Sequence, residues 1–456
     1  MILRQGSVCA NRMKNKEAQF IDIADLRIGL YIYLDLGWMA HPFALNSFRI
    51  ASQEQIDTIR GLDIERIRFS PEQSLPPPPP TLVAGTSVAA ASSTAEASAT
   101  TNGTAPVDSI ADPASVARQQ RREQLSNQRA SLQRCENRFS DATKSYRQVA
   151  ESAHNRPAFA RQQCESAVTA LLAELSEQEE SCIRLLSEKA GEKTSLHAIN
   201  VTVISLLLGK ALGLDEDHMK YLGMGALLHD LGKLDLPDRL RWRDDQFTSA
   251  ERQIYQGHVG HGLSISRSMG LPNEVQQVID QHHELDDGSG YPRRLKGSQI
   301  AELARVVALV NHYDNLCNPG NPALAITPHE ALSLIYAQAK RQFDQRTLGL
   351  FIRMMGVYPP GSVLELNDGR YAMVASVNSS RPLRPQIIIH DSAIPAEEAM
   401  IVDLEHAPDL GIHRSLKPLQ LPRAAFDYLS PRKRLCYFFE RGREAPPANV
   451  DAEVAQ

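Results

Sequence analysis

Side chains that bind transition metals recur at wide intervals through the middle of this chain. They are imidazoles and one carboxylate, in the order His197, His229-Asp230, His258 and His282-His283. A divalent transition metal takes about four to six nitrogen or oxygen ligands, and no single helix can present that many. The fold must therefore bring several segments together around one point. The pattern predicts a metal-dependent hydrolase acting on an anionic substrate.

Helical periodicity dominates the region that carries these ligands. The expected helices are joined by short loops, which predicts an α-helical bundle. After Pro359-Pro360-Gly361 the pattern changes to alternation, and Asn367-Asp368-Gly369 is a hairpin turn signal. The expected helices span 197–212, 216–229, 249–269, 273–283, 300–316 and 328–355, and the expected strands span 362–366, 371–377 and 386–390.

Changes in composition divide the whole chain, for which we expect a mainly α fold. The helical segment has a weak apolar stripe of Leu125, Leu132, Phe139 and Val149. It is either a helical hairpin or dimerising coiled coil, which would make a homodimer, or a solvated helix pair packed on the next domain. The expected parts are an N-terminal extension (1–19), a small α/β module (20–74), a disordered Pro/Ala/Ser linker (75–114), the helical segment (115–190), a catalytic domain (191–360), a small β-rich appendage (361–442) and a disordered tail (443–456).

Charge and composition exclude several classes of protein. The formal net charge of −5 gives no basic surface for a nucleic acid polymer. Residues 1–16 lack the apolar run of a secretory signal, and the apolar stretch 198–214 is too short and too interrupted to span a bilayer. The six cysteines form no CxxC pair, which is typical of free thiols in a reducing compartment. We therefore expect a cytoplasmic protein without a membrane span.

The ligand motifs lie at the ends of expected helices. Asp230 follows His229 and suits a role as a bridge between two metals, while Lys233 opens the next loop. His282 and His283 end a helix just before the glycine-rich turn 287–292. Any one histidine alone is more often a hydrogen-bonded structural residue, but the order and spacing together are far more specific. The histidines that we expect to be structural are His218, His261, His312 and His329.

Together these motifs resemble the signature of the HD-GYP family, a branch of the HD phosphohydrolase superfamily. Residues 20–70 also resemble the N-terminal module often attached to such domains, particularly in 37–43 (Gly-Trp-Met-Ala-His-Pro-Phe). The resemblance implies an HD-type helical bundle with two divalent metal ions per chain, usually iron or manganese. It also implies hydrolysis of the bacterial messenger cyclic di-GMP, to the linear dinucleotide pGpG or on to GMP, by a metal-bound hydroxide.

The resemblance also implies a role for each matching residue. Asp230 and Lys233 would be catalytic, with Lys233 donating to a substrate phosphate. The turn that contains Gly290 and Tyr291 would shape the mouth of the pocket and contact partners such as GGDEF-type signalling proteins. One metal would take His197, His229, Asp230 and the residue at position 311, and the other would take the bridging Asp230 with His258, His282 and His283. The substrate would contact Lys233, Gly290, Tyr291, Arg293 and Arg294.

Three positions depart from the family pattern. Asn311 replaces an aspartate ligand, so affinity for the first metal should fall because an amide carries no charge. Residues 320–323 lack the phosphate-binding cations of the family, for which Arg293, Arg294 and Lys296 could substitute. Lys193 replaces a glutamate that serves a third metal in some members. Two alternatives therefore stay open: a receptor or scaffold that binds cyclic di-GMP with weak or no catalysis, and a phosphohydrolase of another nucleotide.

Overall fold

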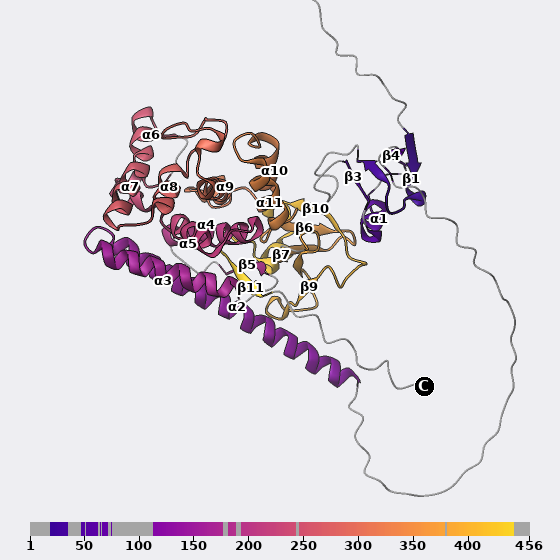
Figure 1. Ribbon diagram of the computed structural model, residues 1–456. Helices are drawn as coiled ribbons and strands as arrows, with labels where there is room; N and C mark the ends of the chain where they lie inside the picture. Colours follow the sequence, from indigo (N-terminus) through magenta and orange to yellow (C-terminus); the bar gives the residue numbers. More distant parts are fainter. Residues whose placement is uncertain are drawn as a thin grey trace, which may run out of the picture. The chain divides into compact units, whose positions relative to one another are not determined.

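The computed structural model shows two compact units, one formed by residues 1–111 and one by residues 112–456 (Figure 1). The expected N-terminal extension apart from Gln19, the 37–43 motif and the tail lie outside the described residues, as does the expected linker except for its last two positions. The described residues are 19–34, 47–50, 52–62, 64, 66–71, 74, 113–176, 181–187, 193–242, 246–378 and 381–441.

The first unit is a four-stranded antiparallel sheet with one helix, in the strand order β1-β4-β2-β3. Its core contains Ile32, Ile56 and Ile67, which alternation and helical spacing place on one side of their elements. The elements are β1 (Gln19–Asp22), β2 (Tyr31–Tyr33), β3 (Ser47–Arg49), α1 (Gln53–Arg60) and β4 (Arg66–Ser70).

A helical hairpin, α2 (Pro113–Ser152) and α3 (Pro157–Ser176), opens the second unit. The chain turns before Pro157 because the residue preceding a proline disfavours the helical conformation. Phe139 and Val149 are fully buried, and α2 packs on the following helices and on the last strand of the chain. The helix pair is therefore packed on the next domain, with its apolar stripe used within the chain.

The bundle is built around α4 (Lys193–Leu212), which contacts α2, α5, α9 and α11. By length and composition the stretch Ser195–Leu212 of α4 could cross a membrane, but 83% of it is buried inside the protein, as in the central helix of a bundle. The other helices are α5 (Glu216–Leu228), α6 (Ser249–Gln256), α7 (His258–Ser268), α8 (Asn273–Gln281), α9 (Glu302–Cys317), α10 (Pro328–Gln338) and α11 (Gln345–Met355).

Two expected helices are each broken in two, so the continuous helices predicted over 249–269 and 328–355 are wrong. Gly257 ends α6 and begins α7, and the ring of His258 turns back to the carbonyl of Tyr255. The second break follows from Asp344, whose side chain accepts from the backbone N–H of Thr347 and so begins α11. Helical periodicity continues across both breaks, which hid them in the sequence.

A seven-stranded antiparallel sheet completes the second unit, with β7 pairing to β5, β6 and β8. The helical prediction for 115–190 is wrong at β5 (Ser181–Leu185), because the partners of this strand, β7 and β11, lie far along the chain and local composition does not show them. The remaining elements are β6 (Val363–Leu366), β7 (Tyr371–Asn378), β8 (Gln386–Ile389), β9 (Ile401–Asp403), β10 (Ile412–Leu416), α12 (Arg423–Leu429) and β11 (Tyr437–Arg441).

Candidate metal centre

Five imidazoles meet around the carboxylate of Asp230, which lies just after the end of α5. They come from α4, the end of α5, the start of α7 and the end of α8. Their ligand atoms form two groups, each with all its atoms within 4.8 Å of one another, and Asp230 belongs to both. We call them the four-ligand group (Asp230, His258, His282 and His283) and the three-ligand group (His197, His229 and Asp230).

Backbone carbonyls fix three of the imidazoles. The Nδ1 atoms of His229, His258 and His282 lie 2.6, 2.5 and 2.8 Å from the carbonyl oxygens three residues earlier in the chain. Because each Nδ1 donates its proton there, the Nε2 atom is left unprotonated and points to Asp230. The three Nε2 atoms lie 3.4 to 3.7 Å from the nearer Asp230 oxygen.

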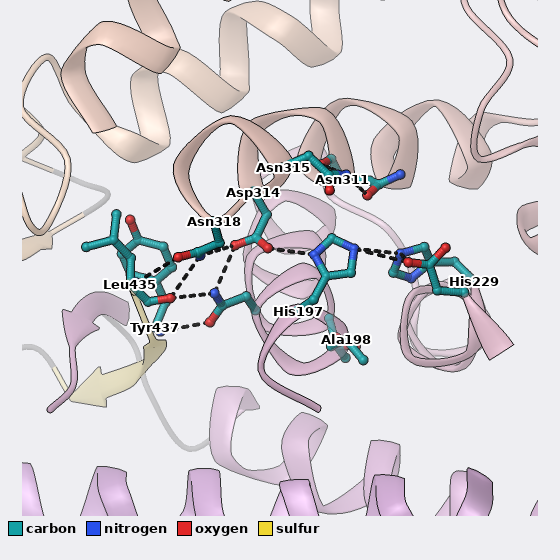
Figure 2. A network of polar contacts seen from close by, with 12 residues as sticks. His197, Ala198, His229, Asn311, Asp314, Asn315, Asn318, Leu435 and Tyr437 are labelled. Atoms are coloured by element: carbon teal, nitrogen blue, oxygen red, sulfur yellow. Dashed lines mark hydrogen bonds and ion pairs between the residues drawn. The ribbon is translucent and has the colours of Figure 1, made fainter. Parts of the chain in front are cut away.

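His197 is fixed by a carboxylate instead. Its Nδ1 donates to Asp314 on α9 at 2.6 Å, and its Nε2 lies 3.2 Å from that of His229 (Figure 2). Asp314 also accepts from Asn200 and Asn318 at 2.9 Å each, and both amides bind the backbone of Leu435 just before β11. The sheet is thereby tied to a metal-ligand candidate.

Asp314 is a residue whose role in the site the sequence motifs do not predict. The ligand motifs of the sequence do not include it, and they predict no residue that orients His197. The spacing of Asn311, Asp314 and Asn318 along one helix face was the available signal, but only the pairing of α9 with α4 shows what that face contacts.

Asn311 is buried at this helix face, but its side-chain oxygen accepts a hydrogen bond from Asn315 at 2.6 Å. Figure 2 shows the Asn311–Asn315 pair apart from the line that joins Asp314, His197 and His229. The amide of Asn311 is therefore engaged along its own helix. The three-ligand group lacks the extra carboxylate that the family pattern places there.

The charges of the centre suit cation binding. Burial would raise the pKa of Asp230, but Lys233 and the neighbouring imidazoles hold it well below its usual range, so the carboxylate is ionised. Burial lowers the pKa of His229 to about 4 and that of His258 to about 3, which keeps both rings neutral. His197 is the exception: burial alone would lower its pKa, yet hydrogen bonds to Asp230 and Asp314 raise it to about 9, so this ring must lose a proton when it binds a metal.

Two ligand atoms show that the residues fit a metal. Asp230 Oδ1 and His283 Nε2 are buried, and neither has a hydrogen-bond partner among the residues that the structure describes. An unpaired buried carboxylate oxygen is costly, because no donor replaces the water it has lost. Ligands on one tetrahedral ion at about 2.1 Å stand about 3.4 Å apart, close to the spacing of the ring nitrogens here. The set of imidazoles with one carboxylate suits divalent transition metals.

Lys233 lies in the loop η5 (Leu231–Asp235), which packs against the start of α7. Its ammonium donates to Asp230 Oδ2 at 2.5 Å. A Cβ at Gly232 would lie 2.0 Å from the carbonyl oxygen of His258, so only glycine allows this approach. The contact brings Lys233 to the same carboxylate as the imidazoles.

The glycine-rich turn is held by Glu284, which is buried and accepts from the backbone N–H groups of Arg293 and Leu295 at 2.6 and 2.9 Å. A Cβ at Gly290 would lie 2.4 Å from the carbonyl oxygen of His283. The ring of Tyr291 stacks on that of His283, with centroids 4.5 Å apart. The turn therefore packs against His283, one of the candidate ligands.

Not all of the predicted substrate contacts face this centre. Arg293 pairs with Asp280 at 2.6 Å, and the side chain of Arg294 is exposed. A cavity of about 100 Å³ lies beside Asp230 instead, and five of its eight lining residues are not predicted as site residues from the sequence. The cavity is lined by Tyr146, His197, Ala198, Asp230, Lys233, Leu234, Arg241 and Trp242.

Comparison with known proteins yields two family matches and several relatives. Residues 172–347 match the HD domain family, and residues 19–164 match a domain of unknown function (DUF3391). A cyclic di-GMP phosphodiesterase of Pseudomonas aeruginosa is 25% identical over 85% of this chain and 89% of its own length. A cyclic di-GMP phosphodiesterase response regulator of Xanthomonas campestris pv. campestris is 33% identical over 40% of this chain and 50% of its own length. A 3'3'-cGAMP-specific phosphodiesterase of Vibrio cholerae is 29% identical over 36% of this chain and 32% of its own length.

Proposed function

The chain belongs to the HD-GYP family of HD-domain phosphodiesterases, and from this premise we propose that it is a metal-dependent enzyme that hydrolyses cyclic di-GMP to pGpG, GMP or both. The observation that carries the proposal is the convergence of five imidazoles on Asp230, with Asp230 Oδ1 and His283 Nε2 buried and unpaired. The names of the Pseudomonas and Xanthomonas relatives support the substrate.

The two groups of ligands would hold two divalent ions that share Asp230. When bound, such ions supply Lewis acidity at the phosphoryl oxygens and a nucleophile at neutral pH. The neutral rings of His229 and His258 present unprotonated nitrogens without first having to lose a proton. We propose Fe or Mn as the ion, because an imidazole-rich set with one carboxylate accepts either.

Lys233 would contact the scissile phosphate. Burial would lower its pKa, but Asp230 raises it, so the ammonium stays charged and can donate to a phosphoryl oxygen or to the leaving oxygen. Arg241 lines the same cavity and is held by the carbonyls of Leu234 and Leu236. It would supply the second cation that residues 320–323 lack.

The glycine-rich turn would serve partners rather than substrate. Its Glu284-bound backbone is rigid, while Pro292, Arg293 and Arg294 are exposed. An exposed, fixed surface of this kind suits contact with a second signalling protein, and we propose GGDEF-type proteins as its partners. We also propose that the chain acts in the cytoplasm, where the messenger is made and used.

The test is turnover by the full chain, purified anaerobically and loaded with Fe(II) or Mn(II), with metal content measured on the same sample. Cyclic di-GMP and 3'3'-cGAMP are compared as substrates, since a Vibrio relative is named for the second. We expect faster turnover of cyclic di-GMP, and none in Asp230→Ala. If the protein binds metal and cyclic di-GMP tightly without turnover, it is a receptor and not an enzyme. If it hydrolyses 3'3'-cGAMP faster, that dinucleotide is the substrate.

A further inference from the structure

One side chain from outside the HD match reaches the cavity beside Asp230. Tyr146 lies on α2 and is only 4% exposed, yet it lines this cavity together with His197 and Lys233. The HD match begins at residue 172, whereas the match to the domain of unknown function ends at residue 164 and so includes Tyr146. The wall of the candidate site therefore comes from both matched parts of the chain.

The hydroxyl of Tyr146 distinguishes it from its neighbours on the same helix face. Phe139 and Val149 are wholly apolar and fully buried in the core. A buried tyrosine normally gives its hydroxyl to a protein partner, but no hydrogen bond joins the Tyr146 hydroxyl to any other residue that the structure describes. Burial and the nearby Asp230 carboxylate raise the pKa of Tyr146, so the hydroxyl keeps its proton and can donate it in a hydrogen bond.

The hairpin that carries Tyr146 is anchored close to the loop of Lys233. His154, in the turn between α2 and α3, contacts Asp235 of that loop, with Nε2 and Oδ1 2.9 Å apart. Arg161 of α3 donates to the carbonyl oxygen of Gly270 after α7 at 2.5 Å. These contacts fix α2 against the helices of the metal centre, so Tyr146 holds its place in the cavity wall.

We infer that Tyr146 is a further substrate-binding residue, whose hydroxyl donates a hydrogen bond to an oxygen of a phosphodiester group held beside Asp230. This inference rests on the proposed function. The cavity of about 100 Å³ has room for a phosphate group but not for a whole dinucleotide. Lys233 already binds Asp230, so a neutral donor on the opposing helix adds a contact without adding charge. The helical hairpin of α2 and α3 thereby forms part of the active site.

The experiment compares Tyr146→Phe with Tyr428→Phe in the full, metal-loaded chain. Tyr428 lies on α12, and within the described part of the chain its buried hydroxyl has no hydrogen-bond partner, so it receives the same change outside the cavity. Inorganic phosphate affinity is measured by calorimetry, and KM and kcat are measured for cyclic di-GMP. We expect Tyr146→Phe to weaken phosphate binding about tenfold or more, the loss typical of a hydrogen bond to a charged group. Metal content should stay at the wild-type value, and Tyr428→Phe should change nothing.

Several results would overturn the inference. The first is that Tyr146→Phe and the wild type have the same phosphate affinity and the same kinetics. The second is that the metal-loaded wild type does not bind phosphate. The third is that Tyr146→Phe loses its metal or its fold, because the hydroxyl would then be a structural group. If the wild type does not turn over cyclic di-GMP, the proposed function fails by itself. The phosphate affinities of the two variants still decide the role of Tyr146 in that case.

Discussion

The two halves of the metal centre, the four-ligand group and the three-ligand group, are held in place by different kinds of contact. In the four-ligand group, His258 and His282 are each fixed by a backbone carbonyl, and His283 is covered by the stacked ring of Tyr291. In the three-ligand group, His197 depends on the Asp314 carboxylate, and Asn311 is turned to Asn315. Counting the shared Asp230 in each, the first group thus offers four ligands, while the second offers three and relies on a network that reaches the sheet.

This difference indicates where the centre is robust and where it can be tuned. Backbone carbonyls at helix ends persist as long as the helices do, so the four-ligand group depends on little beyond the fold. The three-ligand group also requires Asp314, Asn200 and Asn318 to keep their hydrogen bonds. We therefore expect the metal of the three-ligand group to be the weaker one.

Removal of the shared ligand should have the largest effect, because it breaks both halves at once. Asp230→Ala should lower turnover more than about 100-fold, which exceeds the loss typical of outer-sphere partners. Metal content should fall at both sites, as measured on the purified protein. Asp217→Ala, on the exposed face of α5 and outside both groups, is the control. Retention of one tightly bound metal in Asp230→Ala would mean that the groups do not share this carboxylate.

Asp314→Asn should weaken metal binding only in the three-ligand group. The amide would hold His197 less firmly and would no longer raise the basicity of its ring, so we expect about 10- to 100-fold losses in metal affinity and activity. The loss should concern one metal and should be reversed by a higher metal concentration during turnover. Equal loss of both metals would contradict the division into two halves.

The sequence alone could predict the candidate ligands but not the contacts that hold them in place. His229, Asp230 and Lys233 follow one another at the end of a strongly periodic helix, so the structure places them where the pattern predicts. The orientation of His197 depends on Asp314 and, through Asn200, on the segment before β11. These partners lie more than a hundred residues apart, and no local propensity encodes such pairing. Tyr146 was hidden for the same reason.

Acid and base should act differently on the two halves of the metal-free protein. The pKa of His258 is lowered to about 3, so its contribution to stability is present above about pH 6.5 and is lost as the pH falls toward 3. The pKa of His197 is raised to about 9, so its contribution is present below about pH 6.5 and is lost as the pH rises through 9.

Chemical unfolding across pH measures both contributions. His258→Gln should remove about 1.4 kcal/mol per pH unit of the acid-side slope, and His197→Gln a similar slope on the alkaline side. His413→Gln, which changes an exposed histidine on β10 that belongs to neither ligand group, serves as the matched control. Identical pH profiles of the His258 and His197 variants would show that the two halves titrate alike.

Adding a carboxylate at position 311 should have the smallest effect of these changes. It should reduce the difference in metal affinity between the four-ligand and three-ligand groups. Asn311→Asp adds a carboxylate beside the three-ligand group, but Asn315 would still donate to it and oppose its rotation toward the metal. We therefore expect affinity for the weaker metal to rise only a few-fold, with a larger rise in Asn311→Asp/Asn315→Ala. Asn321→Asp, in the loop after α9, adds the same charge elsewhere as a control. Metal titration distinguishes these variants, and unchanged affinity in the double variant would mean that the charge at position 311 does not limit the three-ligand group.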